Sequence, residues 1–430
     1  MIGAQISAND VSDAVLGSAD IGSCILDSCG VGPKGSNLLV AGVHPVDIVE
    51  TNVAAAAEAE KILDRYLTGN NAAIFTLSYD LGRKMMGLNS RIPCQEPDLF
   101  IALFDGLGIH DYESGRGFSI GRQNVDLGAI RSSTEAAAAR EVASNMARGQ
   151  YLNAIAEIKE EIRSGNTYQT NLTHCITAEL DHGAMPESIF RNLRLKHPAP
   201  FAAYIKRHDS TVISASPELF FHVEGSKITA SPIKGTRPRG ATDAEDTALR
   251  NELERSAKDR AENVMIVDLI RNDLGRVCEF GSVKVDDLCT IAEHPSLFHL
   301  VSTVKGRLRS GTRPSDIFNA LFPCGSITGA PKKSTMEIID RLEPAHRGLS
   351  MGTIGMYLPQ GWLGEKAVIE TSVAIRTMVV RGLTATFNVG GGIVIDSDPA
   401  SEYKETLTKA ISLLTAIGAE HLPLTDASAD

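Results

Sequence analysis

Hydrophobic and polar positions alternate along the chain with two different spacings. In one segment the apolar residues Leu152, Ile155, Ile158 and Ile162 recur every three or four positions. This spacing places them on one side of a helix, and Gly165 follows where a helix commonly ends. The segment is therefore predicted to be a helix.

Most other apolar runs are short and bounded by Pro, Gly, Asp or Asn, which is typical of strands. Strands are predicted within 23–28, 37–42, 72–82, 97–112, 167–180, 199–216, 218–233 and 367–380. Further helices are predicted over 47–67 and 243–273 and from about residue 401. Runs of strands with helices grouped between them indicate an α+β fold. We expect antiparallel sheets to form a sandwich-like core with helices packed outside.

The domain organisation has one candidate connection, the Ala- and Arg-rich stretch 132–149. It separates an N-terminal region, 1–130, from a second region, 150–418. We expect the two regions to interleave in one compact unit.

Composition and charge narrow the class of protein. The chain has 430 residues, 43% hydrophobic and 22% charged, and a net charge of −11, which disfavours wrapping of nucleic acid. No apolar run approaches the ~20 residues of a membrane span, and the first residues lack a basic, apolar signal peptide. The seven cysteines are scattered without a CxxC pair, so neither a disulfide framework nor a zinc site is suggested. These features predict a reduced, cytoplasmic enzyme.

One lysine has an unusual sequence context. In "SPIKGTRPRG" (231–240), Lys234 follows an apolar run and precedes a Gly–Thr step. We expect it at the end of a strand, beside a turn rich in backbone N–H groups. Such a position is typical of a pocket wall.

Three carboxylates are candidate metal ligands. Glu262 lies one helical turn from Met265 and Ile266 and can point inward with them, while Glu402 and Glu405 share one face of a helix start. Oxygen ligands converging from distant segments suit Mg²⁺. An exposed charged helix and simple helix caps are the alternatives, and neither segment alone decides between them.

Three further features are compatible with an anionic ligand. The glycines Gly390–Gly392 let backbone N–H groups approach a ligand, although a bulged turn without a ligand is equally compatible. Arg376 lies among apolar residues and needs an anion, either structural or bound. His299 is flanked by Phe298 and Leu300 and has the context of a core histidine. Together these features describe a site for a small dianion.

The longer motifs identify a family. "PIKGTRPRG", "DRAENVMIVDLIRNDLG", "FHLVSTVKG", "CGSITGAPKKSTMEIIDRLEP" and "GGGIVIDSDPASEYKET" resemble the chorismate-utilising enzymes. That family includes anthranilate, aminodeoxychorismate, isochorismate and salicylate synthases. The resemblance covers nearly the whole chain and is strongest over 168–409, so the second region is expected to bind chorismate.

Two positions separate the members of this family. Position 234 is typically alanine in anthranilate synthases and lysine in aminodeoxychorismate synthases, and it is Lys234 here. Gln169 stands where isochorismate and salicylate synthases have a lysine base. The resemblance therefore implies an enzyme that transfers an amino group to C4 of chorismate, giving 4-amino-4-deoxychorismate for p-aminobenzoate and folate synthesis. An anthranilate synthase and a non-catalytic scaffold for a glutaminase are the alternatives.

The resemblance also implies catalytic roles for particular residues. Lys234 attacks C2 of the ring as an uncharged amine, and Glu218 protonates the leaving C4 hydroxyl. His299 orients or polarises the ring substituents.

Substrate and metal contacts follow from the same resemblance. Glu262 and Glu405 match Mg²⁺ ligands, and Glu402 binds the ion through water. Arg376 binds the enolpyruvyl carboxylate. The other expected substrate contacts are Gly235, Thr236, Gly391, Gly392 and Lys409.

The chain departs from its family at one strand. Met356 takes the place of a substrate-binding tyrosine, and Tyr357 comes one position later, so either the strand is bulged or the contact is lost. The stretches around Asp27 and Ser28 and around 198–206 resemble an amino-acid pocket of relatives. No cysteine has the context of a glutaminase nucleophile, so ammonia is expected from a separate glutamine amidotransferase subunit.

Overall fold

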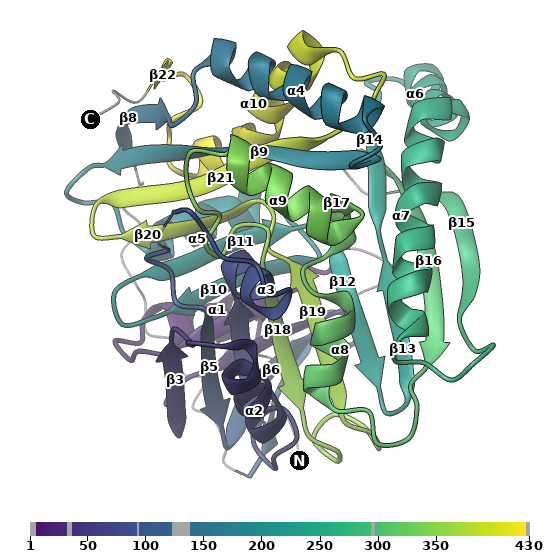
Figure 1. The fold of residues 1–430 in the computed structure, drawn as a ribbon. Coiled ribbons are helices and arrows are strands. Elements are labelled where there is room, and N and C mark those ends of the chain that lie inside the picture. The colour runs from purple at the N-terminus through teal and green to yellow at the C-terminus, as the bar shows by residue number, and fades with distance from the viewer. Residues whose placement is uncertain (1–5, 32–36, 93, 123–137, 294–296, 427–430) are drawn as a thin grey trace.

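Two large sheets organise the residues that the computed structural model describes, namely 6–31, 37–92, 94–122, 138–293 and 297–426. Within these residues the first sheet has twelve strands and the second has ten, and the paired strands are antiparallel except for β22 and β8. Figure 1 shows strands of the first sheet running across the view and most of the second sheet running down it.

The first sheet contains strands from both ends of the chain. Its spatial order is β22 (Leu424–Asp426), β8 (Ala139–Ser144), β9 (Gln169–Leu180), β21 (Thr384–Ile393), β20 (Thr377–Arg381), β11 (Thr211–Ser216), β10 (Phe201–Lys206), β1 (Cys24–Asp27), β2 (Leu38–Gly42), β6 (Gly106–Asp111) and β7 (Arg116–Gly121), with β17 (Gly329–Ala330) on β9.

The second sheet is built in the same way. Its order is β14 (Ile233–Pro238), β16 (Leu297–Arg307), β13 (Lys227–Ser231), β12 (Leu219–Glu224), β19 (Val368–Val373), β18 (Thr353–Leu358), β4 (Ala72–Leu77), β5 (Leu99–Phe104) and β3 (Asp47–Thr51), with β15 (Lys284–Glu293) on β16. Both sheets thus combine strands from before residue 130 with strands from after residue 150. The division into two regions stays a prediction.

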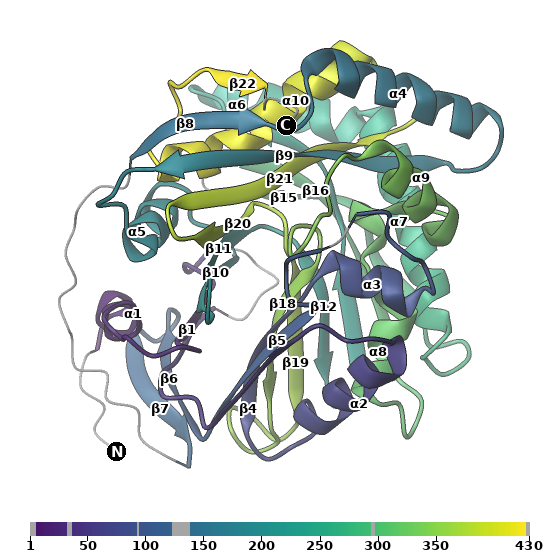
Figure 2. The ribbon, with the colours of Figure 1, turned by 60° about the vertical axis from the view of Figure 1, so that its left-hand side comes forward.

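Helices cover the outer faces of the two sheets. They are α1 (Ala8–Leu16), α2 (Ala56–Tyr66), α3 (Tyr79–Met85), α4 (Arg148–Arg163), α5 (Pro186–Lys196), α6 (Asp243–Arg255), α7 (Ala257–Gly275), α8 (Pro314–Leu321), the 3₁₀ turn η1 (Gly325–Ile327), α9 (Lys332–Leu342) and α10 (Pro399–Ala416). Figure 2 shows α4 and α10 above β9 and β21, and α2, α3 and α8 on the other side of the molecule.

The hydrophobic core has one layer between the two sheets and further layers between each sheet and its helices. Between the sheets, Val40 and Val212 of the first sheet pack with Ile74, Phe100 and Met356 of the second. Separate apolar clusters lie under the helices, one between α2, α7, α8 and the second sheet and one between α1, α5, α10 and the first. This arrangement confirms the predicted α+β fold with a sheet sandwich inside and helices outside.

Several predicted elements have different bounds in the structure. The helix predicted over 47–67 divides into strand β3 and helix α2, because residues 47–51 pair with β5. The helix predicted over 243–273 divides at Ser256, whose extended backbone (φ −62°, ψ 107°) ends α6 while its side chain accepts from Asp259 N to cap α7. The helix predicted around Leu152 is confirmed as α4.

No helix among the described residues is long and apolar enough to cross a membrane.

Candidate active site

Lys234 lies within a bulged strand, so its predicted position at a strand end is wrong. Strand β14 continues to Pro238, and its pairing with β16 is irregular between Lys234 and Thr236. The residue between them, Gly235, has φ +70°, and a Cβ there would lie 2.7 Å from Leu253 Cδ1. Only glycine therefore fits this bulge without strain. Lys234 Nζ donates to the carbonyl of Ser326 at 3.4 Å.

Glu218 is a buried acid beside this lysine. It follows Pro217 between β11 and β12, and 4% of its surface is exposed. Burial raises its pKa, although a hydrogen bond with the Ser326 side chain and the charge of Lys234 oppose the shift. Its Oε1 atom has no hydrogen-bond partner among the described residues. A carboxyl that retains its proton in this way suits a general acid.

Thr236 and His299 face each other across the bulge. The two residues are paired on β14 and β16, and Thr236 Oγ1 lies 2.9 Å from His299 Nδ1. His299 is buried, with 3% exposed. The bulge therefore presents a lysine, a hydroxyl and an imidazole from one short stretch of sheet.

The three glutamates come from α7 and α10, and two of them lie beside the same lysine. Lys258 Nζ lies 3.1 Å from Glu402 Oε1 and 4.0 Å from Glu262 Oε1. Glu402 also accepts from the Ser397 hydroxyl at 2.7 Å. Burial raises the pKa of Glu262, opposed by the charges of Lys234 and Lys258. Glu262 and Glu402 therefore converge on one positive charge.

Glu405 belongs to a second ion pair at the same helix. Lys409 Nζ lies 2.8 Å from Glu405 Oε1 and donates to the carbonyl of Gly390 at 2.9 Å. Burial acts to raise the pKa of Glu405, but the charge and hydrogen bond of Lys409, with Lys258 and Lys234, lower it overall. The predicted alternative that the glutamates cap this helix is wrong, because Asp398 caps it by accepting from Ser401 N.

The three glycines lie inside β21, so the bulged turn considered for them does not form. Residues Gly390–Gly392 pair without interruption with β9. A Cβ on Gly391 would lie 3.3 Å from Glu402 Oε2, and one on Gly392 would lie 2.5 Å from Gln169 Nε2. The absence of side chains thus opens the sheet surface toward Glu402.

Arg376 lies between β19 and β20, so the strand predicted over 367–380 is interrupted there. Its φ is +48°, a conformation that is uncommon for a residue with a side chain. Burial lowers the pKa of its guanidinium, and no ion pair to it occurs among the described residues. A strained, half-buried cation without an ion pair is typical of an anion-binding position. No hydrogen bond among the described residues joins it to Lys234.

Sequence reasoning missed two residues of the site. Ser326, in the loop between α8 and α9, contacts both Lys234 and Glu218, and its hydroxyl lies 3.3 Å from Cys324 Sγ. The motif "CGSITGAPKK" carried the family resemblance but gave no role to this serine. Lys258 was detectable, because it precedes Glu262 by one helical turn.

Tyr357 does not take over the role of the displaced family tyrosine. Strand β18 pairs regularly with β4 and β19, so it has no bulge at this point. The Tyr357 hydroxyl donates to the carbonyl of Gly69 at 2.9 Å. Met356 instead packs in the core between the sheets.

The two stretches expected to form an amino-acid pocket do line one cavity. Asp27, Ser28 and 200–203 meet there, together with Met356 and Glu370. The Asp27 carboxylate is already engaged by Cys29 N at 2.7 Å, the Tyr112 hydroxyl at 2.8 Å and the Arg194 guanidinium.

The geometry and the sequence define one class of protein. Residues 27–415 match the family described as chorismate binding enzyme, and the chain belongs to this family. Its motifs had predicted this membership.

Individual relatives narrow the similarity. Over 370 residues the chain is 37% identical to aminodeoxychorismate synthase component 1 of Bacillus subtilis (strain 168), covering 80% of this chain and 76% of the relative. It is 41% identical over 288 residues to an anthranilate synthase component 1 of Haloarcula marismortui, covering 67% and 56%. The crystal structure of anthranilate synthase component I from Streptococcus pneumoniae TIGR4 has the same fold, with a TM-score of 0.75 at 24% identity over 89% of this chain and 92% of that chain.

Proposed function

We propose that this chain is the synthase component that replaces the C4 hydroxyl of chorismate with an amino group, giving 4-amino-4-deoxychorismate for p-aminobenzoate and folate synthesis. One observation carries the proposal. Ser326 holds the amine of Lys234 through its carbonyl and the acid Glu218 through its side chain, so a nucleophile and a proton donor meet at one residue. The similarity to aminodeoxychorismate synthase component 1 supports the same reaction.

The reaction divides into two displacements. The Lys234 amine adds to C2, the conjugated double bonds shift, and the C4 oxygen leaves as water with the proton of Glu218. Ammonia then adds to C4 and passes one proton to the Glu218 carboxylate, the double bonds shift back, and the bond between C2 and Lys234 breaks. The free amine and the acid are thereby restored. Chorismate and ammonia thereby give 4-amino-4-deoxychorismate and water. The raised pKa of Glu218 supports its role, because the acid keeps its proton until the leaving group needs it.

Glu262, Glu402 and Glu405 fit a Mg²⁺ site. They provide hard oxygen donors from two helices, and they already attract the ammonium group of Lys258 in this structure. Bound Mg²⁺ supplies the positive charge that anchors the ring carboxylate. Glu402 is held toward this position by Ser397, and Lys258 has to release Glu402 when the ion binds.

The remaining residues are assigned to substrate binding. The half-buried Arg376 guanidinium is proposed to pair with the enolpyruvyl carboxylate, which would give it the anion that it lacks. Thr236 and His299 offer a hydroxyl and an imidazole beside the Lys234 bulge, where they can orient the ring substituents. Gly235, Gly391, Gly392 and Lys409 complete the proposed contacts.

Ammonia is proposed to come from a separate glutamine amidotransferase subunit. With that subunit absent, ammonium salts should replace glutamine as the nitrogen source. Glutamine itself should then support no reaction.

The experiment uses purified protein with chorismate, Mg²⁺ and ammonium, followed by an aminodeoxychorismate lyase. We expect p-aminobenzoate only after the lyase is added. Anthranilate synthase is the second candidate, because this chain is also similar to an anthranilate synthase component 1. That enzyme would release pyruvate and a fluorescent product without the lyase. Formation of neither product in the presence of all components would contradict both, and would favour a scaffold that only binds its partner.

A further inference from the structure

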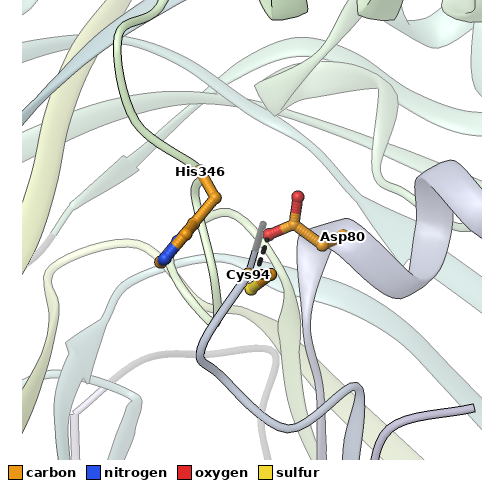
Figure 3. A group of neighbouring side chains, drawn as sticks. All are labelled: Asp80, Cys94 and His346. Carbon is orange, nitrogen blue, oxygen red and sulfur yellow. Dashed lines mark hydrogen bonds between the residues drawn. The ribbon is translucent and has the colours of Figure 1, made fainter. Parts of the chain in front are cut away.

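A second group of side chains lies away from the proposed chorismate site. Among the described residues, Asp80, Cys94 and His346 bring three potential metal ligand atoms within 4.8 Å of one another. Asp80 is in the first turn of α3, Cys94 lies between α3 and β5, and His346 lies between α9 and β18. In Figure 3 a dashed line joins the Asp80 carboxylate to the Cys94 thiol, and His346 lies beside them.

The protein already holds two of these groups in position. Asp80 Oδ2 accepts from Gly348 N at 2.8 Å and from Cys94 Sγ at 3.3 Å. Asp80 is also buried, with 5% exposed. The carboxylate is therefore oriented by the backbone toward the thiol, as an outer hydrogen bond orients a metal ligand.

The ring nitrogens of His346 make few hydrogen bonds to the described residues. Its Nδ1 atom is buried without a hydrogen-bond partner among the described residues. Its Nε2 atom accepts only a long hydrogen bond, 3.4 Å, from Gln95 N. A buried ring nitrogen without a hydrogen-bond partner costs folding free energy unless a ligand binds it.

The neighbouring positive charges do not oppose a cation at this place, because they are already paired. The Arg83 guanidinium lies 2.6 Å from Asp340 Oδ1, and that of Arg347 lies 2.7 Å from Glu343 Oε1. The Asp80 carboxylate is the charged group that contacts the thiol among the described residues.

We propose that Asp80, Cys94 and His346 form a binding site for a thiophilic divalent ion such as Zn²⁺. One sulfur, one nitrogen and one oxygen ligand from three separate segments suit Zn²⁺, with water in the fourth position, and do not suit Mg²⁺. The thiol releases its proton to solvent as the sulfur binds, and the metal charge replaces the proton in the contact with Asp80. The scattered cysteine spacing gave no sign of this site, because its ligands meet only in the folded chain.

A bound ion would also brace part of the proposed catalytic site. Arg347 follows His346 directly and donates to the carbonyls of Ile327, at 2.9 Å, and Asn171, at 2.6 Å. Ile327 follows Ser326, which accepts from Lys234. The metal would therefore hold the turn from which Arg347 reaches the Ser326 loop.

Cobalt titration of the full chain tests the proposal. Chelator-treated protein, kept reduced with a phosphine and saturated with Mg²⁺, is titrated with Co²⁺. We expect one equivalent to give a thiolate-to-cobalt charge-transfer band that Zn²⁺ abolishes. Cys94→Ser should lose the band, and His346→Asn should weaken binding by at least about tenfold, since removal of a mere outer-shell partner costs about 10–100-fold. Cys175→Ser, at a cysteine on β9, should bind as the wild type does.

Melting temperatures separate loss of the site from loss of the fold. Zn²⁺ should raise the melting temperature of the wild type and of Cys175→Ser but not of Cys94→Ser or His346→Asn. The proposal is overturned if the wild type shows no charge-transfer band, or if either ligand variant keeps both the band and the zinc shift. None of these measurements uses chorismate, so their outcome is independent of the proposed amination.

Discussion

Glu218 and Asp27 are both buried carboxyl groups, 4% and 2% exposed, but their surroundings differ. Asp27, in the N-terminal cavity, meets a backbone N–H, a tyrosine hydroxyl and the Arg194 guanidinium. Glu218 leaves Oε1 without a partner, and burial raises its pKa. A buried carboxylate with hydrogen-bond and ion-pair partners stabilises the fold. A buried carboxyl group that lacks such partners is more typical of a functional site. We therefore assign Asp27 to architecture and Glu218 to chemistry.

Replacing Lys234, the proposed partner of Glu218 in catalysis, should have the largest effect on the reaction rate. Lys234→Ala removes the proposed nucleophile and should lower formation of 4-amino-4-deoxychorismate by on the order of 10³-fold or more. Ammonia then has access to C2, so we expect release of some anthranilate instead. The coupled lyase assay and anthranilate fluorescence measure both products. Lys227→Ala, at an exposed lysine on β13 in the same sheet, is the matched control. Undiminished p-aminobenzoate from Lys234→Ala would exclude the covalent route.

Glu218→Gln should lower kcat by about 10²–10⁴-fold, the usual contribution of a general acid. The wild type should lose activity as the pH rises through the raised pKa of Glu218, because the proton is then missing, and the variant should lack this limb. Measuring kcat as a function of pH for both proteins tests for this alkaline loss of activity. Glu224→Gln, at an exposed position of β12, should keep the wild-type profile. An identical alkaline limb in Glu218→Gln would assign that limb to another group.

The same substitution should change the pH dependence of stability. Because the folded-state pKa of Glu218 is raised, the protonated form is favoured by folding, and its contribution is present at low pH and lost as the pH rises through the raised value. Glu218→Gln should therefore gain stability relative to the wild type with rising pH. Chemical denaturation at a series of pH values tests this sign, and a difference that stays constant with pH would refute it.

Asp27→Asn should act in the opposite way, on stability and not on catalysis. Breaking the ion pair leaves the Arg194 guanidinium without its carboxylate, which should cost about 3 kcal/mol of unfolding free energy. The kcat of the folded protein should stay unchanged. Asp209→Asn, at an exposed position, should change neither quantity. A loss of kcat without a loss of stability in Asp27→Asn would reverse the assignment.

Glu402 is a third buried carboxyl group, paired with Lys258 in this structure and proposed to bind Mg²⁺. A substitution of Lys258 tests whether the lysine competes with the ion. Lys258→Met removes the ammonium group that lies 3.1 Å from Glu402 Oε1, so Mg²⁺ should bind more tightly, by about fivefold for ~1 kcal/mol of competing interaction. Calorimetric titration with Mg²⁺ measures the change. Lys404→Met, an exposed lysine of the same helix α10, is the control. Weaker binding in Lys258→Met would show that this lysine supports the ion and does not compete with it.

Local pattern predicted much of the fold, and its errors have identifiable causes. Helix α4 followed from the spacing of its apolar residues, since one face packs on the core. Residues 47–51 formed a strand because β5 offered a pairing edge, which no local pattern displays. The break at Ser256 was missed because an extended serine between two helical stretches leaves the helical spacing almost unchanged.

The candidate site divides in the same way. Motifs gave the residue types at 218, 234, 262, 299, 376, 402 and 405, because the chemistry needs those side chains and they stand in long recognisable stretches. They did not give Ser326 its position between Lys234 and Glu218, nor Lys258 its place among the glutamates. Those contacts join segments far apart in the chain.

The sequence by itself determined the family, the α+β class and which residues are proposed as reacting groups, because each depends on residue type and local order. Tertiary structure alone decided which carboxyls lack partners, where Gly235 bulges its strand, and that Asp80, Cys94 and His346 share one space. Desolvation and ligand geometry depend on distances between remote segments, and only the folded chain sets those distances.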